Sequence, residues 1–133
     1  MLEKALEELA TREGFAGCPF KEWRGDIKKF VPTKSIHRGS LIYAKDEWTV
    51  YFIMPDGEVI KNPCKVAKYE TSNYAGDEGY ACEGETIGEA LERYPARWVV
   101  LFHREILDRD GDYYHSEEVY IVDLESQGGE KEW

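Results

Sequence analysis

The dipeptide Asp110-Gly111 and its flanking residues constrain the fold of this chain more than any other feature of its sequence. A two-residue hairpin turn of type I′ needs positive φ at both central positions, and Asp-Gly is one of the pairs that satisfies this need. With these residues as the turn, Arg109 faces Asp112, and this pairing sets the register of both strands. The turn therefore predicts an antiparallel hairpin within residues 98–124.

The predicted register brings complementary side chains together across the hairpin. Arg104 faces Glu117 and His103 faces Glu118, so basic groups meet carboxylates. Farther from the turn, apolar residues meet one another in three successive pairs: Phe102 with Val119, Leu101 with Tyr120, and Val100 with Ile121. Such matched pairs stabilise a sheet by a few tenths to about 1 kcal/mol each. The assumed turn thus accounts for about twenty residues at once.

The acids at alternate positions from Asp108 onward also raise the possibility of a calcium-binding loop. A helix-loop-helix calcium loop needs glycine at position 6 and a bidentate glutamate at position 12. Counted from Asp108, these positions hold Tyr113 and Val119. The flanking segments are β-branched and aromatic, which favours strands over helices. The hairpin is the better interpretation, and we predict no metal site in this loop.

Two helices are predicted from apolar spacing and capping residues. The first ends before Gly14, and its apolar residues follow the i, i+3, i+4, i+7 spacing of one helix face. These residues are Leu2, Ala5, Leu6 and Leu9. The second begins after Thr86, which forms a capping-box pattern with Glu89, and Pro95 ends it. A short helix is also compatible with residues 26–30, because Pro32 would end it.

The central part of the chain predicts strands. In residues 40–54 the side chains follow the period of two that is typical of a strand. Residues 55–57 are of the types that favour a turn, and residues 58–61 are expected to pair back against residues 51–54. These segments predict a three-stranded antiparallel meander. With the helices and the hairpin, the pattern predicts a single α+β domain over residues 1–125 and a frayed tail over residues 126–133. Residues 71–85 are predicted to form a long loop.

Charge is unevenly distributed along the chain, whose net charge is −10. Residues 1–45 carry a net charge of +3 and residues 46–133 a net charge of −13. Within the first part, residues 21–45 hold seven basic and two acidic side chains. The sequence therefore predicts an electrically polar molecule with a basic region on an acidic body.

Several features bear on the cellular setting. The longest apolar run has five residues, 98–102, against about 20 for a membrane span, and the N-terminus lacks the features of a signal peptide. Three cysteines at no recognisable spacing favour free thiols in a reducing compartment. These features predict a cytoplasmic protein without a membrane partner. A third of the residues are charged and only three are Asn or Gln, a bias that is typical of thermophile proteins.

Motifs of common enzyme classes are absent from the sequence. It has no phosphate-binding loop, dinucleotide fingerprint or nucleophile elbow, and its cysteines and histidines do not form the close pairs of structural zinc sites. We therefore predict neither a metal nor a cofactor. His103 with Glu118 is the best acid–base-capable pair, although a surface contact is the simpler interpretation. The alternative function, a metal-dependent hydrolase or nuclease, would use groups converging at the hairpin: His103, Asp108, Asp110, Asp112 and Glu118.

A non-catalytic interaction protein is the favoured prediction. In the basic segment, cations that contact phosphates are interleaved with aromatic rings that stack on bases, a mixture that binds single strands. The candidate residues there are Lys21, Trp23, Arg24, Lys28, Lys29, Lys34 and Arg38. The other interpretation is a solvated segment whose aromatic rings enter the core, and the charge of −10 opposes nucleic acid at long range.

The acidic C-terminal half offers a second interaction surface. Glu117 and Glu118 are its candidate residues for docking a basic patch of a protein partner, whereas solubility alone also explains such acids. The predicted partner is thus an unidentified protein or a nucleic acid.

Overall fold

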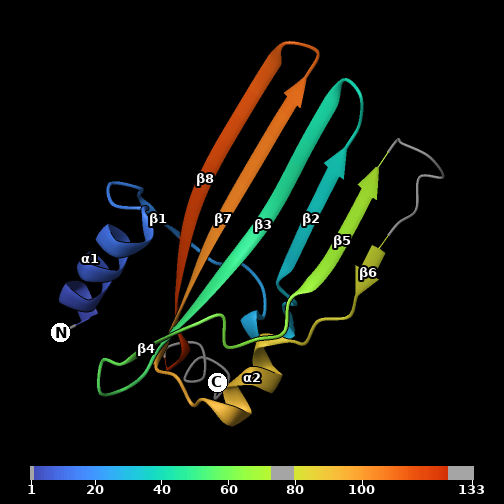
Figure 1. Cartoon of the computed structure of the whole chain (residues 1–133). Helices are drawn as coiled ribbons and strands as arrows, with labels where there is room; N and C mark the ends of the chain where they lie inside the picture. Colours follow the sequence, from blue (N-terminus) through green and yellow to red (C-terminus); the bar gives the residue numbers. More distant parts are fainter. Residues whose placement is uncertain (1, 73–79, 126–133) are drawn as a thin grey trace.

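A computed structural model describes residues 2–72 and 80–125, and its strands form one open, mixed sheet (Figure 1). The helical elements are α1 (Leu2–Glu13), the 3₁₀ helix η1 (Ile27–Lys29) and α2 (Ile87–Arg93). The strands are β1 (Phe20–Glu22), β2 (Thr33–Arg38), β3 (Ile42–Ile53), β4 (Val59–Lys61), β5 (Ala67–Ser72), β6 (Tyr80–Cys82), β7 (Trp98–Arg109) and β8 (Asp112–Asp123). Their order is β1-β8-β7-β3-β2-β5-β6, with β4 also paired to β3. The predicted α+β class is confirmed.

The predicted C-terminal hairpin is formed by β7 and β8. Asp110 (φ 47°) and Gly111 (φ 93°) both have the positive φ of the expected turn. Arg109 pairs with Asp112, and every pair predicted between residues 100–104 and 117–121 is present. The pairing continues one to one over the whole length of both strands, so no bulge shifts the alternation of side chains.

The predicted three-stranded meander is present only in part, because residues 59–61 pair back antiparallel against residues 51–53 as predicted, whereas the sheet as a whole is mixed. Residues 42–53 form a single strand, β3, and β7 occupies one of its edges. On the other edge β2 pairs with residues 43–47 and β4 with residues 51–53, so β2 and β4 lie one after the other. The sheet is mixed because β1 pairs parallel to β8 and β2 pairs parallel to β5. Parallel partners are not joined by a tight turn, so no local sequence signal marks them.

Parts of the predicted loop and tail lie outside the described residues, namely residues 73–79 and 126–133. The described flanks of the predicted loop 71–85 contain the end of β5 and all of β6. Among the described residues, no helix has both the length and the apolar character needed to cross a membrane.

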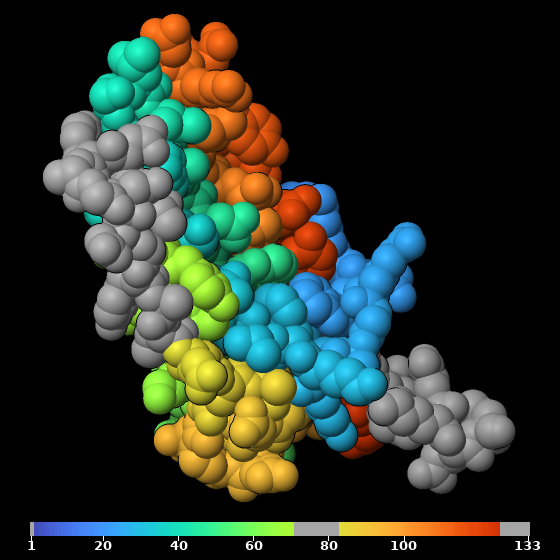
Figure 2. Space-filling model, turned by 90° about the vertical axis from the view of Figure 1, so that its right-hand side faces the viewer, coloured from blue at the N-terminus to red at the C-terminus, as the bar shows by residue number. Residues whose placement is uncertain are grey.

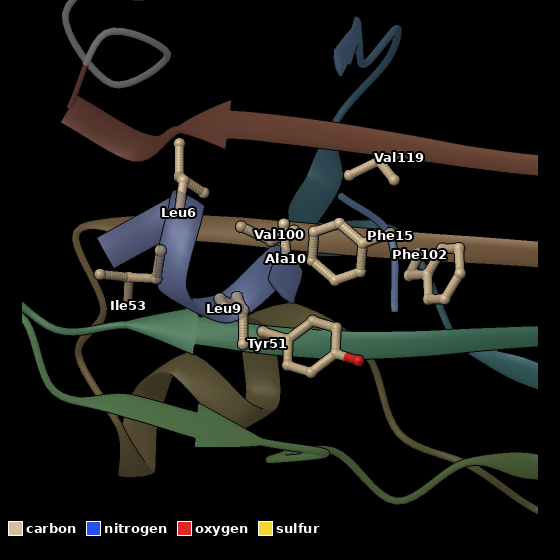
Figure 3. Close-up of a cluster of buried hydrophobic side chains, with 9 residues drawn as sticks. All are labelled: Leu6, Leu9, Ala10, Phe15, Tyr51, Ile53, Val100, Phe102 and Val119. Carbon is tan, nitrogen blue, oxygen red and sulfur yellow. The ribbon is translucent and has the colours of Figure 1, made fainter. Parts of the chain in front are cut away.

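Two apolar clusters pack on opposite faces of the sheet, because successive side chains of a strand point to opposite faces. On one face, α1 and the turn after it pack on the strands (Figure 3). This cluster contains Leu6, Leu9, Ala10, Phe15, Tyr51, Ile53, Val100, Phe102 and Val119. On the other face, η1 and α2 contribute to a cluster of Ile27, Val50, Phe52, Cys64, Ile87, Ala90, Val99, Leu101 and Val122.

The second face is organised by a close contact between η1 and α2. Figure 2 shows α2 in yellow beside the light-blue segment that carries η1. The backbone N–H of Ile87 donates to the carbonyl oxygen of Phe30 at 2.9 Å. Thr86 and Glu89 form the predicted capping box at the start of α2. This contact holds residues 27–30 against the sheet next to the aromatic side chains described below.

The strands β3, β7 and β8 extend well beyond the helices (Figure 1). At their far end the backbone N–H of Asp110 donates to the carbonyl oxygen of Leu41 at 2.9 Å, which joins the β7–β8 turn to the β2–β3 turn. Leu41, Tyr113 and Tyr114 are more than half exposed there. We call residues 42–49, 103–109 and 112–118 the distal half of the sheet.

Candidate functional site

Three neighbouring strands bring an indole, an imidazole and a carboxylate together in the distal half of the sheet. Trp48 of β3 lies opposite His103 of β7, which in turn lies opposite Glu118 of β8. All three side chains point to the same face of the sheet, the one that η1 and α2 cover at the other end of the strands. The residues next to them in each strand point to the opposite face, where α1 packs.

His103 is fixed in orientation and surrounded by carboxylates. Its Nε2 lies 3.0 Å from Oδ1 of Asp46, and its Nδ1 lies 3.7 Å from Oε1 of Glu118 and 4.0 Å from Oε1 of Glu105. The imidazole stacks on the indole of Trp48, with ring centroids 4.0 Å apart and an angle of 9° between the planes. The side chain is only 12% exposed.

The hairpin register explains why the two rings stack. In a hairpin with a two-residue loop, the residues that flank the turn exchange both backbone hydrogen bonds, and this type of pair recurs at every second position. Counted from Arg109 and Asp112, the backbone groups of His103 therefore face β8. The pair of Trp48 and His103 is consequently a non-hydrogen-bonded pair, the kind in which side chains approach most closely.

Glu118 is held by two further groups. The hydroxyl of Tyr120 donates to its Oε1 at 3.0 Å, and the ammonium of Lys21 forms an ion pair with its Oε2. Lys21 belongs to β1 and lies opposite Tyr120 of β8. The hydrogen bonds from Lys21 and then from Tyr120 lower the pKa of Glu118. Burial, and then the neighbouring Glu118, raise the pKa of Tyr120. Glu118 is thus an ionised acceptor with both oxygens occupied.

Aromatic rings form a wall beside the imidazole. Trp23 lies edge to face with Phe30, Trp48 and Tyr120, at centroid distances of 4.9, 5.8 and 5.4 Å. All four rings pack against the cluster on the face covered by η1 and α2. Trp23 and Phe30 belong to the basic segment, so the structure places these two rings of the segment against the sheet.

The basic side chains of the segment 21–45 are spread over several elements. Lys21 lies in β1 against Glu118, Lys28 and Lys29 lie in η1, and Lys34 of β2 is 3.5 Å from Glu47. Arg38 ends β2. Arg24 lines an open surface pocket of about 550 Å³ together with Lys21, Glu22, Trp23 and Tyr120. The structure therefore brings Lys21, Trp23 and Arg24 together and places the other basic candidates elsewhere.

The acids of the hairpin do not form one group. Asp110 lies in the turn, Asp112 pairs with Arg109 across it, and Asp108 faces the opposite side of the sheet from His103. Five residues of extended chain separate Asp108 from His103, a distance of about 16 Å at about 3.3 Å per residue.

Glu117 lies on the face opposite to His103. Its carboxylate is 3.2 Å from Nε of Arg104 and 3.3 Å from Nε2 of His115. Of the five groups predicted for a hydrolase, the structure brings His103 together with Glu118 and places the three aspartates toward the turn. The two candidate acids for protein docking, Glu117 and Glu118, point to opposite faces of the same strand.

A group not predicted from the sequence, Asp46, His103 and Glu105, has the composition and spacing that could hold a metal ion. One ligand atom from each lies within 4.8 Å of the others. Asp46 and Glu105 are direct cross-strand partners of β3 and β7. Both also line a surface pocket of about 290 Å³, together with Ser35, His37, Ala44, Lys45, Ile106, Leu107 and Tyr114.

Asp46 and Trp48 were missed because the pairing of β3 with β7 has no local signal. The alternation of residues already places Asp46 with Trp48 on one strand face and His103 with Glu105 on another. Which strand lies beside β7, and in which register, depends on a contact between segments about fifty residues apart in the sequence. The charge match of Glu47 with Arg104 is consistent with the observed register but too common to specify it.

The outer edge of β8 is only partly paired. β1 pairs with residues 119–121, and no strand within residues 2–72 and 80–125 pairs with residues 112–118 on that side. By the alternation that starts at the turn, the backbone groups of Tyr113, His115 and Glu117 face outward.

Comparison of the chain with protein-family models, with curated proteins and with solved structures finds no match.

Proposed function

We propose that this protein binds another protein by adding an extended segment of the partner to the outer edge of β8. The observation that carries the proposal is the free edge over residues 112–118, where no described strand lies beside β8. Seven residues match the usual length of a strand. The outward backbone groups of such an edge are a template for an added strand.

Charge favours a basic partner segment. Asp112, Glu117 and Glu118 lie along this edge, and the chain as a whole carries a charge of −10. Glu117 and Glu118 already form ion pairs with Arg104, His115 and Lys21. An extended segment with Lys or Arg opposite Asp112 would add a cross-strand pair there, and the net negative charge would attract it. Tyr113 and Tyr114, which are 65% and 54% exposed, add aromatic surface of the kind enriched in protein interfaces.

A second copy of this chain fits the edge less well. If two β8 strands paired antiparallel about His115, Asp112 of each copy would face Glu118 of the other. Like charges directly opposite one another destabilise a sheet. The acids of the edge therefore favour a different, basic chain over self-association.

Nucleic acid also has less support as the partner. Trp23 and Phe30 pack with other rings, and Lys21 and Lys34 form ion pairs with Glu118 and Glu47. Stacking on bases and contacts to phosphates need such groups to be available. The net charge of −10 adds long-range repulsion.

Peptide selection combined with a proline variant tests the proposal. A library of random twelve-residue peptides is selected on the protein, and recovered peptides are labelled and titrated by fluorescence anisotropy. We expect basic residues to alternate with β-branched residues. His115→Pro should weaken binding at least about tenfold, because proline removes an outward N–H while the bonds to β7 remain. His115→Ala is the matched control and should bind within about twofold of the parent.

Three results would contradict the proposal. One is equal binding by His115→Pro and His115→Ala, with circular dichroism showing both folded. Another is ¹⁵N chemical-shift changes on peptide binding that lie away from residues 112–118. The last is saturable, salt-sensitive binding of labelled DNA or RNA that is lost when Lys28, Lys29 and Lys34 are neutralised, which would make nucleic acid the partner.

A further inference from the structure

We propose that Asp46, His103 and Glu105 bind a divalent transition-metal ion of the Zn²⁺ class. Imidazole nitrogen and carboxylate oxygen both ligate Zn²⁺, and its open sites combine three protein ligands with a water in the fourth position. The ligand atoms of the three residues already lie within 4.8 Å of one another. The inference concerns a different part of the distal half from the β8 edge and does not depend on the partner proposed above.

The spacing of Asp46 and His103 already suits a shared ion. A tetrahedral ion bonded to a nitrogen and an oxygen at about 2.0–2.1 Å holds these atoms about 3.3 Å apart. Nε2 of His103 and Oδ1 of Asp46 are 3.0 Å apart. Only a small adjustment of this pair is needed to admit the ion.

Glu105 is the ligand that has to move. Its side chain is 41% exposed and that of Asp46 is 42% exposed, whereas that of His103 is 12% exposed and stacked on Trp48. The two carboxylates thus retain rotamer freedom around one fixed imidazole. A preset nitrogen with adjustable oxygens lowers the ordering cost of closing the site, because only two side chains change rotamer.

The second ring nitrogen lies near a carboxylate, the kind of partner that a metal-bound histidine usually has, but beyond hydrogen-bond distance. Metal-ligating histidines donate their other N–H to a carboxylate or carbonyl, which fixes the tautomer and raises the basicity of the ligand. Nδ1 of His103 lies 3.7 Å from Oε1 of Glu118, whose own position is fixed by Lys21 and Tyr120. The order carboxylate, imidazole, metal is therefore available through Glu118, His103 and the proposed ion.

The charge balance of the group also favours a cation. Asp46 and Glu105 lie directly opposite one another, an arrangement that costs free energy in a sheet unless a positive charge lies between them. The ion-pair partner that the structure gives to both carboxylates is His103. Lys45, which lines the same pocket, pairs with Glu47, and Lys21 pairs with Glu118. A divalent ion supplies the charge that a single imidazole cannot supply to these two carboxylates.

Space for water or a small ligand lies beside the two carboxylates of the proposed site. Asp46 and Glu105 line the pocket of about 290 Å³, with His37 and Tyr114 also on its surface. Three protein ligands and one exchangeable position are the pattern of zinc sites that keep a reactive water.

Titration of the untagged full-length protein with Zn²⁺ by calorimetry, and with Ni²⁺ by tryptophan fluorescence, tests the site. Ni²⁺ quenches nearby indoles, and Trp48 lies 4.0 Å from the proposed ligand ring. We expect one saturable Zn²⁺ site per chain and quenching by Ni²⁺ with the same stoichiometry. Asp46→Asn and Glu105→Gln should each weaken both signals at least about tenfold, because each removes a charged ligand without changing side-chain shape.

Two control variants keep the test decisive. Glu117→Gln removes a carboxylate from the opposite face, and His115→Ala removes an imidazole near it; both should bind the metals as the parent does. Absence of saturable binding up to millimolar metal would overturn the inference. So would unchanged affinity in folded Asp46→Asn and Glu105→Gln, or loss of binding in His115→Ala.

Discussion

The imidazole of His103 lies flat against the indole of Trp48, with 4.0 Å between the ring centroids. On its other sides Trp48 contacts Trp23, Phe30 and Tyr120. Trp48 is therefore the side chain that joins the apolar cluster beneath η1 and α2 to the polar group around His103. Order in the polar group depends on the packing of this ring.

Replacement of Trp48 by alanine should lower the free energy of unfolding by about 3 kcal/mol, at the lower end of values for buried aromatic residues, since the ring is only partly buried. Urea unfolding followed by circular dichroism measures the change. Tyr113→Ala, at a side chain that is 65% exposed, is the control and should change stability by less than about 0.5 kcal/mol. Equal effects of the two substitutions would show that Trp48 does not have this packing role.

The contrast between the two edges of β7 shows how far the sequence could predict this fold. The pairing of β7 with β8 follows from Asp110-Gly111, because a two-residue turn fixes every later pair. The pairing of β7 with β3 on the other edge has no such turn. Helices α1 and α2 were likewise predictable, because their periodicity and capping residues are local.

The candidate site likewise contains some contacts that could be predicted from the local sequence and others that could not. His103 and Glu118 were predicted as a pair, since both belong to the hairpin. Asp46 and Trp48 reach His103 only through the long-range β3–β7 register, and Lys21 reaches Glu118 only through the parallel pairing of β1 with β8. Side-chain alternation was known for each strand separately. The identity of the neighbouring strands was the missing information.

Glu85 should make the stability of the protein sensitive to acid. Hydrogen bonds from Arg93 and from the backbone N–H of Lys65 lower the pKa of this carboxyl to about 2. Because the pKa is lower in the folded state than its ordinary value of 4.5, the stabilisation is present above about pH 4.5 and is lost as the pH falls through about 2.

The variant Glu85→Gln should therefore be less stable than the parent at pH 7, and this difference should shrink between about pH 4.5 and pH 2. Urea midpoints measured across this range give the difference at each pH. Glu92→Gln, at an exposed position of α2, controls for the removal of one negative charge from this part of the chain. A difference that stays constant down to pH 2 would contradict the role assigned to Glu85.

Cys64 should be protected from alkylation in the folded protein. Burial, and then the neighbouring Glu85, raise the pKa of its thiol to about 12. At pH 8 only about one thiol in ten thousand is then ionised, and the thiolate is the reactive form. With iodoacetamide at pH 8, peptide mass mapping should show modification of the partly exposed Cys18 well before Cys64. Both should react in urea; equal rates in the folded protein would mean that Cys64 is accessible.

Gly88 should resist replacement by alanine although it lies in a helix. Glycine is usually less favourable than alanine in a helix interior by about 1 kcal/mol. Here, however, a Cβ would lie 2.9 Å from the carbonyl oxygen and 3.2 Å from the Cβ of Lys28. Because the first of these atoms is backbone, relief requires η1 and α2 to move apart, and overpacking of this kind costs about 1–3 kcal/mol.

Gly88→Ala should thus lower the free energy of unfolding, and urea denaturation with a matched helix control tests this. Glu92→Ala places the same side chain at an exposed position of α2 and should change stability by less than about 0.5 kcal/mol. The N–H of Ile87, which donates to the carbonyl of Phe30, reports on the contact independently. Its hydrogen exchange should be faster in Gly88→Ala than in the control. A gain in stability with unchanged exchange would show that helix propensity outweighs the contact between the two helices.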